Sequence, residues 1–234
     1  MRSRLAWAVA SVLAVSLLSA DPAFAQQSVN FSIGYFTVRG EDARVDGDVL
    51  VVNRDLYLFD FSDFNTASFG AEWLAPLGDY IEVGAGIGFS SRGVDTIYDE
   101  FVRPDGSEIE QQLKLRIIPI TGTVRVLPLG RHAAFQPYVG GGIGIYNWRY
   151  SETGDFIDFT RVGNPIFRDS FVASDTSIGP VAVFGARFPV GTNATFGGEV
   201  RYQKAEGDLD ELDFLAPKID LGGFHYSVTF GVRF

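Results

Sequence analysis

The chain has 234 residues, no cysteine, and 29 acidic against 19 basic side chains, so its formal net charge is −10. This acidity argues against nucleic-acid binding, which needs clustered Lys and Arg, and the missing cysteines exclude disulfides and a lipoprotein acylation site. The length fits one large β domain or two small ones, and because no linker interrupts residues 26–234 we expect a single domain there.

The first 25 residues have the pattern of a secretory signal peptide. Arg2 and Arg4 precede the uncharged apolar run Leu5–Leu18, and Ala23–Ala25 is a small-x-small cleavage motif. The run is shorter than the roughly 20 residues that a membrane-spanning helix needs. We therefore predict cleavage after Ala25 and export from the cytoplasm, which would leave 17 basic and 28 acidic residues and a net charge of −11.

The rest of the chain alternates between apolar and polar or small residues with period 2, and helical periodicity is scarce. This pattern predicts β-strands separated by turn and loop signals. Most of them have about the 9–11 residues that cross a bilayer at a tilt. The eight expected strands are Val29–Val38, Thr66–Leu74, Tyr80–Ser90, Leu113–Val126, Pro137–Tyr150, Ser177–Phe188, Ala194–Lys204 and Gly223–Phe234.

Two stretches leave the strand pattern open to alternatives. The alternation of Leu113–Val126 changes parity around Pro119, which predicts a β-bulge because proline cannot donate a ladder hydrogen bond. Val49–Phe61 could form a further pair of strands, in which case the sheet would have ten strands instead of eight.

The connections between these strands are alternately short and long. Short ones are expected at Ala75–Asp79, Leu127–Gln136 and Pro189–Asn193. Long, polar and acidic ones are expected at Arg39–Phe64, Ser91–Gln112, Ser151–Thr176 and Ala205–Leu221. Tight turns at one end and long loops at the other are typical of an outer-membrane barrel with periplasmic turns and extracellular loops.

The polarity of the two strand faces decides between two kinds of barrel. A soluble lipocalin-like barrel turns its apolar residues toward a central cavity. Here the polar faces carry Glu, Arg, Lys, Thr and many Gly, whereas the apolar faces are almost uninterrupted, so we expect the apolar side to face lipid. The predicted fold is an all-β, transmembrane, antiparallel up-and-down barrel of about eight strands.

The final strand ends on an aromatic residue and keeps its alternation to the last position. Its apolar set is Phe224, Tyr226, Val228, Phe230, Val232 and Phe234. Pairing of this strand with the first one would close the barrel and remove both sheet edges.

These features resemble the small Gram-negative outer-membrane β-barrel superfamily that includes OmpA, OmpX, OmpW and the opacity proteins. The most specific stretches are "IIPITGTVRVLPLG" followed by "PYVGGGIGIYNW", together with "GGEVRYQKAEGDL" and "KIDLGGFHYSVTFGVRF". The resemblance implies a location in the outer membrane, contact with its lipids and lipopolysaccharide, and recognition of the C-terminal strand by the barrel-assembly machinery. It implies no single activity, because members differ in what the barrel does.

Eight charged residues fall on the faces expected to point inward, and charges of both signs inside a narrow barrel should form a network. Such a network could line a gated path or could plug the lumen. Inward glycines at Gly84, Gly86, Gly88, Gly140, Gly142 and Gly144 would leave room for long side chains or water. The expected network is Glu72, Glu82, Lys114, Arg116, Arg125, Arg187, Glu199 and Arg201.

Aromatic residues near the strand ends are expected to form two girdles at the membrane–water interfaces. They are Tyr35, Trp73, Tyr80, Tyr138, Trp148, Tyr150 and Tyr202, with Phe234 at the C-terminus.

Catalytic and metal chemistry find little support in the sequence. His225 and Ser227 resemble the His-x-Ser pair of lipid A deacylases, but the Asn that follows there is Val228 here, and no acid lies downstream. His132 is too distant to make a metal site with His225. The acidic stretches Glu206–Asp213 and 60–65 lack the spacing of an EF-hand loop, so we expect solvated faces, no metal site and no cofactor.

The third long connection is rich in phenylalanine. Phe156, Phe159, Phe167 and Phe171 would not all lie in water, so we expect this loop to fold over the barrel mouth as a lid or partner-binding surface.

These observations leave three functional hypotheses. The first is a non-enzymatic narrow pore or binder of small, apolar solutes. The second is a structural or adhesive surface protein with a plugged lumen that acts through long acidic loops. The third and least supported is a lipid A-modifying enzyme.

Overall fold

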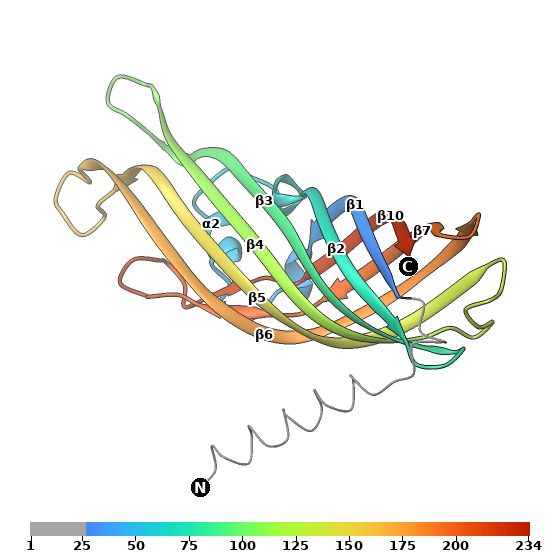
Figure 1. The fold of residues 1–234 in the computed structure, drawn as a ribbon. Coiled ribbons are helices and arrows are strands. Elements are labelled where there is room, and N and C mark those ends of the chain that lie inside the picture. Colours follow the sequence, from blue (N-terminus) through green and yellow to red (C-terminus); the bar gives the residue numbers. More distant parts are fainter. Residues whose placement is uncertain (1–26) are drawn as a thin grey trace, which may run out of the picture.

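Eight antiparallel strands close into one barrel in the computed structural model, which describes residues 27–234. The predicted signal peptide, residues 1–25, lies outside the described residues. Neighbouring strands in the barrel are β1-β10-β7-β6-β5-β4-β3-β2, so every strand pairs with the barrel strands before and after it in the chain. The prediction of an eight-stranded up-and-down barrel is confirmed (Figure 1). The strands are β1 (Ser28–Val38), β2 (Thr66–Pro76), β3 (Ile81–Val102), β4 (Glu108–Val126), β5 (Gln136–Ile157), β6 (Ile166–Val190), β7 (Ala194–Gln203) and β10 (Gly223–Arg233).

The chain ends close the barrel as the alternation of the last strand predicts. β1 pairs with β10 from Ser28↔Arg233 to Val38↔Gly223, and the amide of Phe234 donates to the carbonyl of Gln27 at 2.9 Å. The backbone groups of both strands are therefore paired in a ladder, and the closed sheet has no free edge along this seam.

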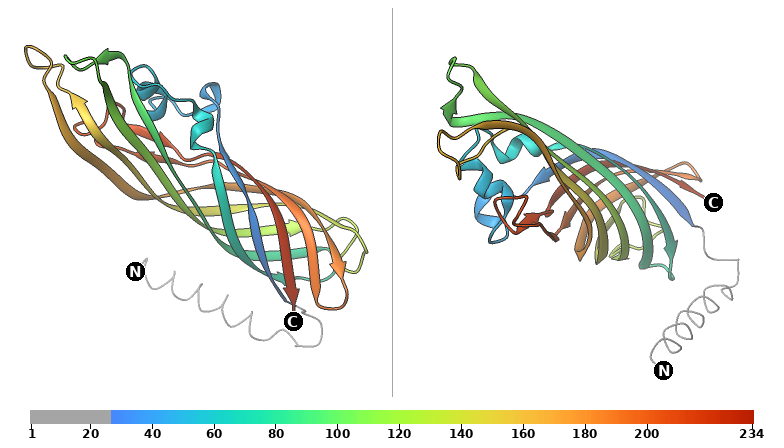
Figure 2. Two further views of the ribbon diagram at one scale, coloured as in Figure 1. Left: turned by 90° about the horizontal axis from the view of Figure 1, so that it is seen from above. Right: turned by 90° about the vertical axis from the view of Figure 1, so that its left-hand side faces the viewer.

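The barrel is far longer on one side than on the other. β3, β4, β5 and β6 have 22, 19, 22 and 25 residues, whereas β1, β2, β7 and β10 have only 10 or 11. The four long strands run beyond the short ones as two hairpins, which Figure 2 shows extending from one end of the barrel. Two of the four expected long loops are therefore strand over most of their length, with irregular connections only at residues 103–107 and 158–165.

A short helix lies inside the end of the barrel from which the two hairpins extend, here called the wide end, and the long strands partly enclose it (Figure 2). This helix, α2 (Val49–Arg54), belongs to the β1–β2 connection together with the 3-10 helices η1 (Glu41–Ala43) and η2 (Phe61–Phe64). The alternative of ten barrel strands is wrong, because Val49–Arg54 is helical and Tyr57 makes only an isolated bridge to Tyr98. The two further strands, β8 (Glu206–Asp208) and β9 (Lys218–Asp220), form a small sheet of their own.

The predicted bulge at Pro119 is absent. The register between β4 and β5 is continuous from Gln111↔Gly154 to Val126↔Val139, with Pro119 opposite Tyr146. What changes near Pro119 is the polarity of the two faces. Toward the short turns the inward residues of β4 are Thr121, Thr123 and Arg125.

Toward the hairpins the same inward face carries Leu113, Leu115 and Ile117, all buried. The outward residues invert correspondingly, from Val126, Val124 and Ile120 to polar and charged side chains. The core of the molecule is therefore polar in one half of the barrel and apolar in the other.

Candidate functional site: the closed lumen

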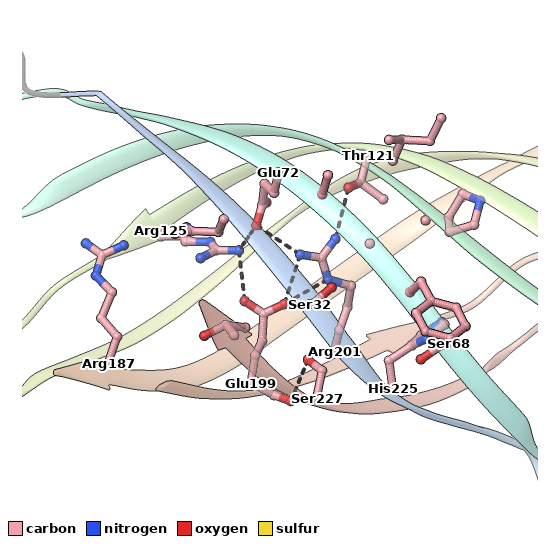
Figure 3. A pocket seen from close by; sticks show the side chains of 18 of the residues that line it. Ser32, Ser68, Glu72, Thr121, Arg125, Arg187, Glu199, Arg201, His225 and Ser227 are labelled. Atoms are coloured by element: carbon pink, nitrogen blue, oxygen red, sulfur yellow. Dashed lines mark hydrogen bonds and ion pairs between the residues drawn. The ribbon is translucent and has the colours of Figure 1, made fainter. Parts of the chain in front are cut away.

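The centre of the barrel is filled by a network of ion pairs between β2, β4 and β7. Arg125, which is 1 % exposed, binds Glu72 and lies 2.9 Å from Oε2 of Glu199 through Nη2. Arg201 approaches the same two carboxylates, with Nη2 at 2.9 Å from Glu199 Oε1 and 3.2 Å from Glu72 Oε2. Two guanidinium groups thus share two carboxylates across the lumen, as Figure 3 shows.

Neutral side chains complete this network. Thr123 donates to Glu72 at 3.1 Å, Tyr138 donates to Glu199 at 3.0 Å, and Nη1 of Arg201 donates to Thr121 at 3.0 Å. The inward glycine at Gly84 leaves the room that Glu72 needs, since a Cβ there would lie only 2.8 Å from Glu72 Oε1. Buried charges persist only when paired and hydrogen-bonded, and this site meets both conditions.

A second pair closes the lumen nearer the short turns. Arg187 binds Glu82 and donates from Nε to Oε1 of Gln136 at 2.9 Å. The same Gln136 oxygen accepts a bond of 3.0 Å from Arg233. The Tyr138 ring lies between the two ion-pair groups, with the guanidinium carbons of Arg125 and Arg187 at 4.7 and 5.9 Å from its centre.

A small polar cavity adjoins the network on the side toward the helix. Its volume is about 60 Å³, which is room for roughly four water molecules. Its lining includes Ser32, Ser68, Arg201, His225 and Ser227. Figure 3 shows the pocket walls contributed by several strands.

His225 and Ser227 do not form a catalytic pair in this cavity. Nε2 of His225 lies 3.2 Å from Oε1 of Gln203, and its ring packs against Phe36 at 4.5 Å between centroids. The hydroxyl of Ser227 donates to the carbonyl of Glu199 at 3.4 Å. Each side chain is thus engaged with other partners, whereas a nucleophile needs its base within hydrogen-bond reach.

The other half of the lumen is occupied by apolar side chains packed around α2. Val49 and Leu50 of the helix are completely buried, and so are Trp148 and Tyr150 of β5. Leu113 and Ile117 of β4 and Phe64 at the end of η2 belong to the same cluster. Together with the ion-pair network, this core closes the barrel from the short turns to the wide end.

Buried polar groups hold α2 in place within the apolar core. The Asn53 side-chain amide donates to Tyr150 at 3.1 Å and to Glu152 at 2.6 Å, and Tyr150 also donates to Glu152 at 2.9 Å. The outward residues next to Glu152 on β5, Ser151 and Thr153, are polar. Glu152 therefore lies beyond the part of the barrel whose outer face is apolar. Burial raises the pKa of the Glu152 carboxyl, and the bonds from Asn53 and Tyr150 offset part of that rise.

A second anchor ties the connection before α2 to β9. Arg39 pairs with Asp220, Arg44 pairs with Asp48, and Oδ1 of Asp48 accepts the Asp220 amide at 2.9 Å. Burial raises the pKa of Asp48, partly offset by its bond to Arg44. Sequence reasoning missed these residues and Asn53 and Glu152. The only available signal was the helical spacing of the buried positions Val49, Leu50 and Asn53, which is short enough to be mistaken for strand.

Two residues expected in the luminal network lie elsewhere. Lys114 and Arg116 point outward, because the alternate, inward positions of β4 are taken by Leu113, Leu115 and Ile117. The prediction assumed a parity change at Pro119 that does not occur. The other six residues, Glu72, Glu82, Arg125, Arg187, Glu199 and Arg201, point into the lumen.

Three of the aromatic residues expected in the girdles also point inward. Tyr138 is 3 % exposed within the ion-pair region, and Trp148 and Tyr150 are fully buried in the apolar core. Large aromatic side chains therefore fill part of the lumen in both its polar and its apolar half. The outer face carries Tyr35, Trp73, Tyr80 and Tyr202, with Tyr35 opposite Tyr226 and Tyr202 packed on Phe224 at 4.8 Å.

The phenylalanine-rich segment does not fold over the mouth as a lid. It extends β5 and β6 as a hairpin, with Phe156 opposite Phe167 and the Phe156 ring 4.9 Å from that of Phe171. Phe159 is 48 % exposed near the tip. The segment that closes the lumen at this end is α2, whose Val49 and Leu50 are buried in the apolar core.

The acidic stretches show no metal-binding geometry. Within residues 27–234 no cluster of three or more His, Asp or Glu side chains is arranged to hold a metal ion. Glu206 pairs with Lys218 at 3.1 Å, and the side chains of Asp60 and Asp63 cap the two ends of the first turn of η2. In the same part of the chain no helix is long and apolar enough to cross a membrane.

Neither a protein-family description nor a curated protein sequence matches this chain. Among solved structures it is similar to Neisserial surface protein A, with 13 % identity, 90 % of this chain and 99 % of that chain covered, and a TM-score of 0.47. It is equally similar to a major outer membrane protein from Thermus thermophilus, with 12 % identity, the same coverage and a TM-score of 0.47.

A third similar structure is the Yersinia pestis outer membrane protein Ail, with 20 % identity, 89 % and 99 % coverage, and a TM-score of 0.33. Because the TM-scores of these structures are below 0.5, the fold is established by the closed strand order described above.

Proposed function

We propose that this protein is a non-enzymatic outer-membrane β-barrel with a closed lumen, which acts at the cell surface through its protruding hairpins. The observation that supports this function most strongly is that side chains close the barrel on both sides of the small central cavity. The ion pairs of Arg125 and Arg187 close one half, and the apolar core around α2 closes the other.

The outer face supports insertion in a membrane. Ile87, Ile120, Ile145 and Ile178 form one continuous row across β3, β4, β5 and β6, and each is at least 43 % exposed. On β4 the apolar outward residues run from Ile118 to Val126. That span is about 27 Å along the strand, or about 20 Å along the membrane normal at the usual tilt of roughly 40°. This height is close to the roughly 25 Å apolar band of outer-membrane barrels.

Membrane insertion also orients the molecule. The short turns would lie in the periplasm, and the two long hairpins would extend from the outer surface. The C-terminal strand would present Phe224, Tyr226 and Phe234 outward to lipid, and we propose that the barrel-assembly machinery reads this strand during insertion.

The protruding half offers surfaces for a protein partner. β6 pairs with β7 only as far as Val181↔Gln203, and the Lys204 amide still donates to the Pro180 carbonyl at 3.2 Å. Beyond that point the second edge of β6 pairs with no barrel strand of residues 27–234. An unpaired edge can accept an extended segment of another protein by strand addition. The hairpin tips add exposed apolar side chains, among them Val102, Phe159, Val162 and Phe167.

Single-channel recording in a planar bilayer tests the closed lumen. Insertion would first be verified by protease protection of the barrel strands. We expect no stable openings from the inserted protein, because the ion pairs and the apolar core around α2 occupy the lumen of residues 27–234. Reproducible openings that Glu199→Gln alters, and that the exposed control Glu206→Gln does not, would overturn the closed lumen and establish a solute path.

A further inference from the structure

Three basic side chains lie together on the outer face of the barrel, on neighbouring strands. Arg116 of β4 is directly opposite Arg149 of β5, and Lys114 follows on the same face of β4. Lys114 and Arg149 are exposed, and Arg116 is partly exposed. Directly opposed residues on paired strands have Cβ atoms about 5 Å apart, so the two guanidinium groups share one patch of surface.

None of these three cations has an anionic partner within the described part of the chain. The structure records no ion pair for Lys114, Arg116 or Arg149 with residues 27–234, and Nε of Arg116 is buried without a hydrogen-bond partner there. Other arginines of the same hairpins are paired: Arg103 with Asp155, and Arg161 with Asp158 at 3.1 Å.

The unpaired cluster is notable in a chain of net charge −10. Asp95, the nearest outward acid by register, accepts a bond from Gln112 at 2.7 Å instead of pairing with Lys114. An unsatisfied group of cations in a chain rich in carboxylates indicates that the counter-ion comes from outside the protein.

The position of the cluster indicates what that counter-ion is. One step toward the short turns, the outward residues are Ile118 and Asn147, and the next step is the isoleucine row with Ile120 and Ile145. Arg116 is four residues from Ile120, about 13 Å along the strand. The cluster therefore borders the apolar belt at its outer boundary, where lipid headgroups begin.

We propose that Lys114, Arg116 and Arg149 bind the phosphate groups of an anionic lipid in the outer leaflet, a site that rests on the proposed membrane insertion. Guanidinium groups bind phosphate through paired N–H donors, and Lys adds a third positive charge. The aliphatic stems of all three side chains can lie along the apolar belt while their charged ends reach the headgroup.

The test measures retention of a phosphorylated lipid by the folded protein. The protein is reconstituted in phosphatidylcholine nanodiscs that contain a small fraction of a diphosphorylated glycolipid, and bound lipid is counted by native mass spectrometry. Wild type should retain the phosphorylated lipid selectively. The triple variant Lys114→Gln, Arg116→Gln, Arg149→Gln should weaken retention about fivefold for each charge removed, on the order of 100-fold in all.

The matched control is Arg168→Gln. Arg168 is exposed on β6 and lies opposite Asp155, which is six residues farther along β5 than Arg149. Its removal takes one positive charge from the protruding region and should leave retention unchanged. If the triple variant does not fold, Arg149→Gln alone is compared, with about a fivefold loss expected.

Three results with the variants and with competing phosphate would overturn the site, and a fourth comes from wild type alone. The first three are retention by the triple variant equal to wild type, an equal loss in Arg168→Gln, or displacement of the lipid by millimolar inorganic phosphate, which would make the ligand a free anion. Wild-type protein that inserts as a folded barrel but retains no phosphorylated lipid would refute this site alone. Protein that does not insert into any bilayer would refute the proposed function.

Discussion

Arg125 is the residue on which the polar half of the lumen depends. It is 1 % exposed, contacts both Glu72 and Glu199, and packs over the Tyr138 ring. Its positive charge reduces the repulsion between the buried carboxylates of Glu72 and Glu199. Removing one member of a buried ion pair costs more than the pair contributes, because the remaining charge stays buried without compensation.

We therefore expect Arg125→Met to lower the free energy of unfolding by about 3–5 kcal/mol. Urea-induced unfolding from lipid vesicles, followed by Trp fluorescence, measures this change. Arg161→Gln is the control: its side chain is 76 % exposed at a hairpin tip, and it should alter stability by less than about 0.5 kcal/mol. An Arg125→Met barrel as stable as wild type would show that the network contributes nothing to stability.

α2 is the element that distinguishes this barrel from an open tube. Its buried positions are Val49, Leu50 and Asn53, so one face of a six-residue helix meets the apolar core. So short a helix is not stable on its own, and its structure depends on tertiary packing. The Asn53 bond to Glu152 then fixes the helix laterally, because an unpaired buried carboxylate would be costly.

Leu50→Ala should loosen α2 while leaving the barrel closed. Loss of a fully buried Leu costs about 2–5 kcal/mol, and the loss should appear as local opening because the strands retain their ladders. Hydrogen exchange of residues 49–64 should rise strongly, with exchange in β1 and β10 unchanged. Arg54→Ala is the control, because the Arg54 side chain is 41 % exposed. Equal exchange in both variants would show that α2 is not held by its apolar face.

At the scale of the whole molecule, the polarity of the barrel inverts along its length. Near the short turns the outside is apolar and the inside is charged, as a lipid environment requires. In the hairpin half the outside is polar and the inside is apolar, as in a water-soluble protein. The level at which the inversion occurs, close to Ile118, marks the outer edge of the proposed membrane.

A charge introduced on the outer face should therefore be costly in one half and tolerated in the other. Ile143 is 64 % exposed near the middle of the apolar belt, and Ile143→Arg should cost about 2–4 kcal/mol of folding free energy in lipid vesicles. Val172, 42 % exposed on the outer face of the hairpin half, should accept Arg at a cost of at most about 1 kcal/mol. Equal costs at the two positions would contradict the proposed membrane boundary.

Much of this architecture follows from the local alternation of side chains along each strand, so it could be predicted from the sequence. Strict alternation places Glu72, Arg125 and Glu199 on the faces opposite the long apolar runs, and the last strand ends where closure with β1 requires it. The same alternation predicts about eight barrel strands, with ten left open until the structure shows Val49–Arg54 as a helix. These features need only the two-residue period of a strand and the separation of polar from apolar side chains.

Other features depend on which medium each strand face meets, and a period of two does not contain that information. Lys114 and Tyr150 belong to strands whose faces exchange roles beyond the proposed membrane boundary, so the same alternation places a lysine outside and a tyrosine inside. The filling of the lumen by α2 was equally hidden, because the helix is stabilised by side chains from β4, β5 and the β8–β9 segment, far away in sequence. The sequence by itself determined a closed barrel with a charged interior, and only the tertiary structure decided where that interior becomes apolar and what closes it.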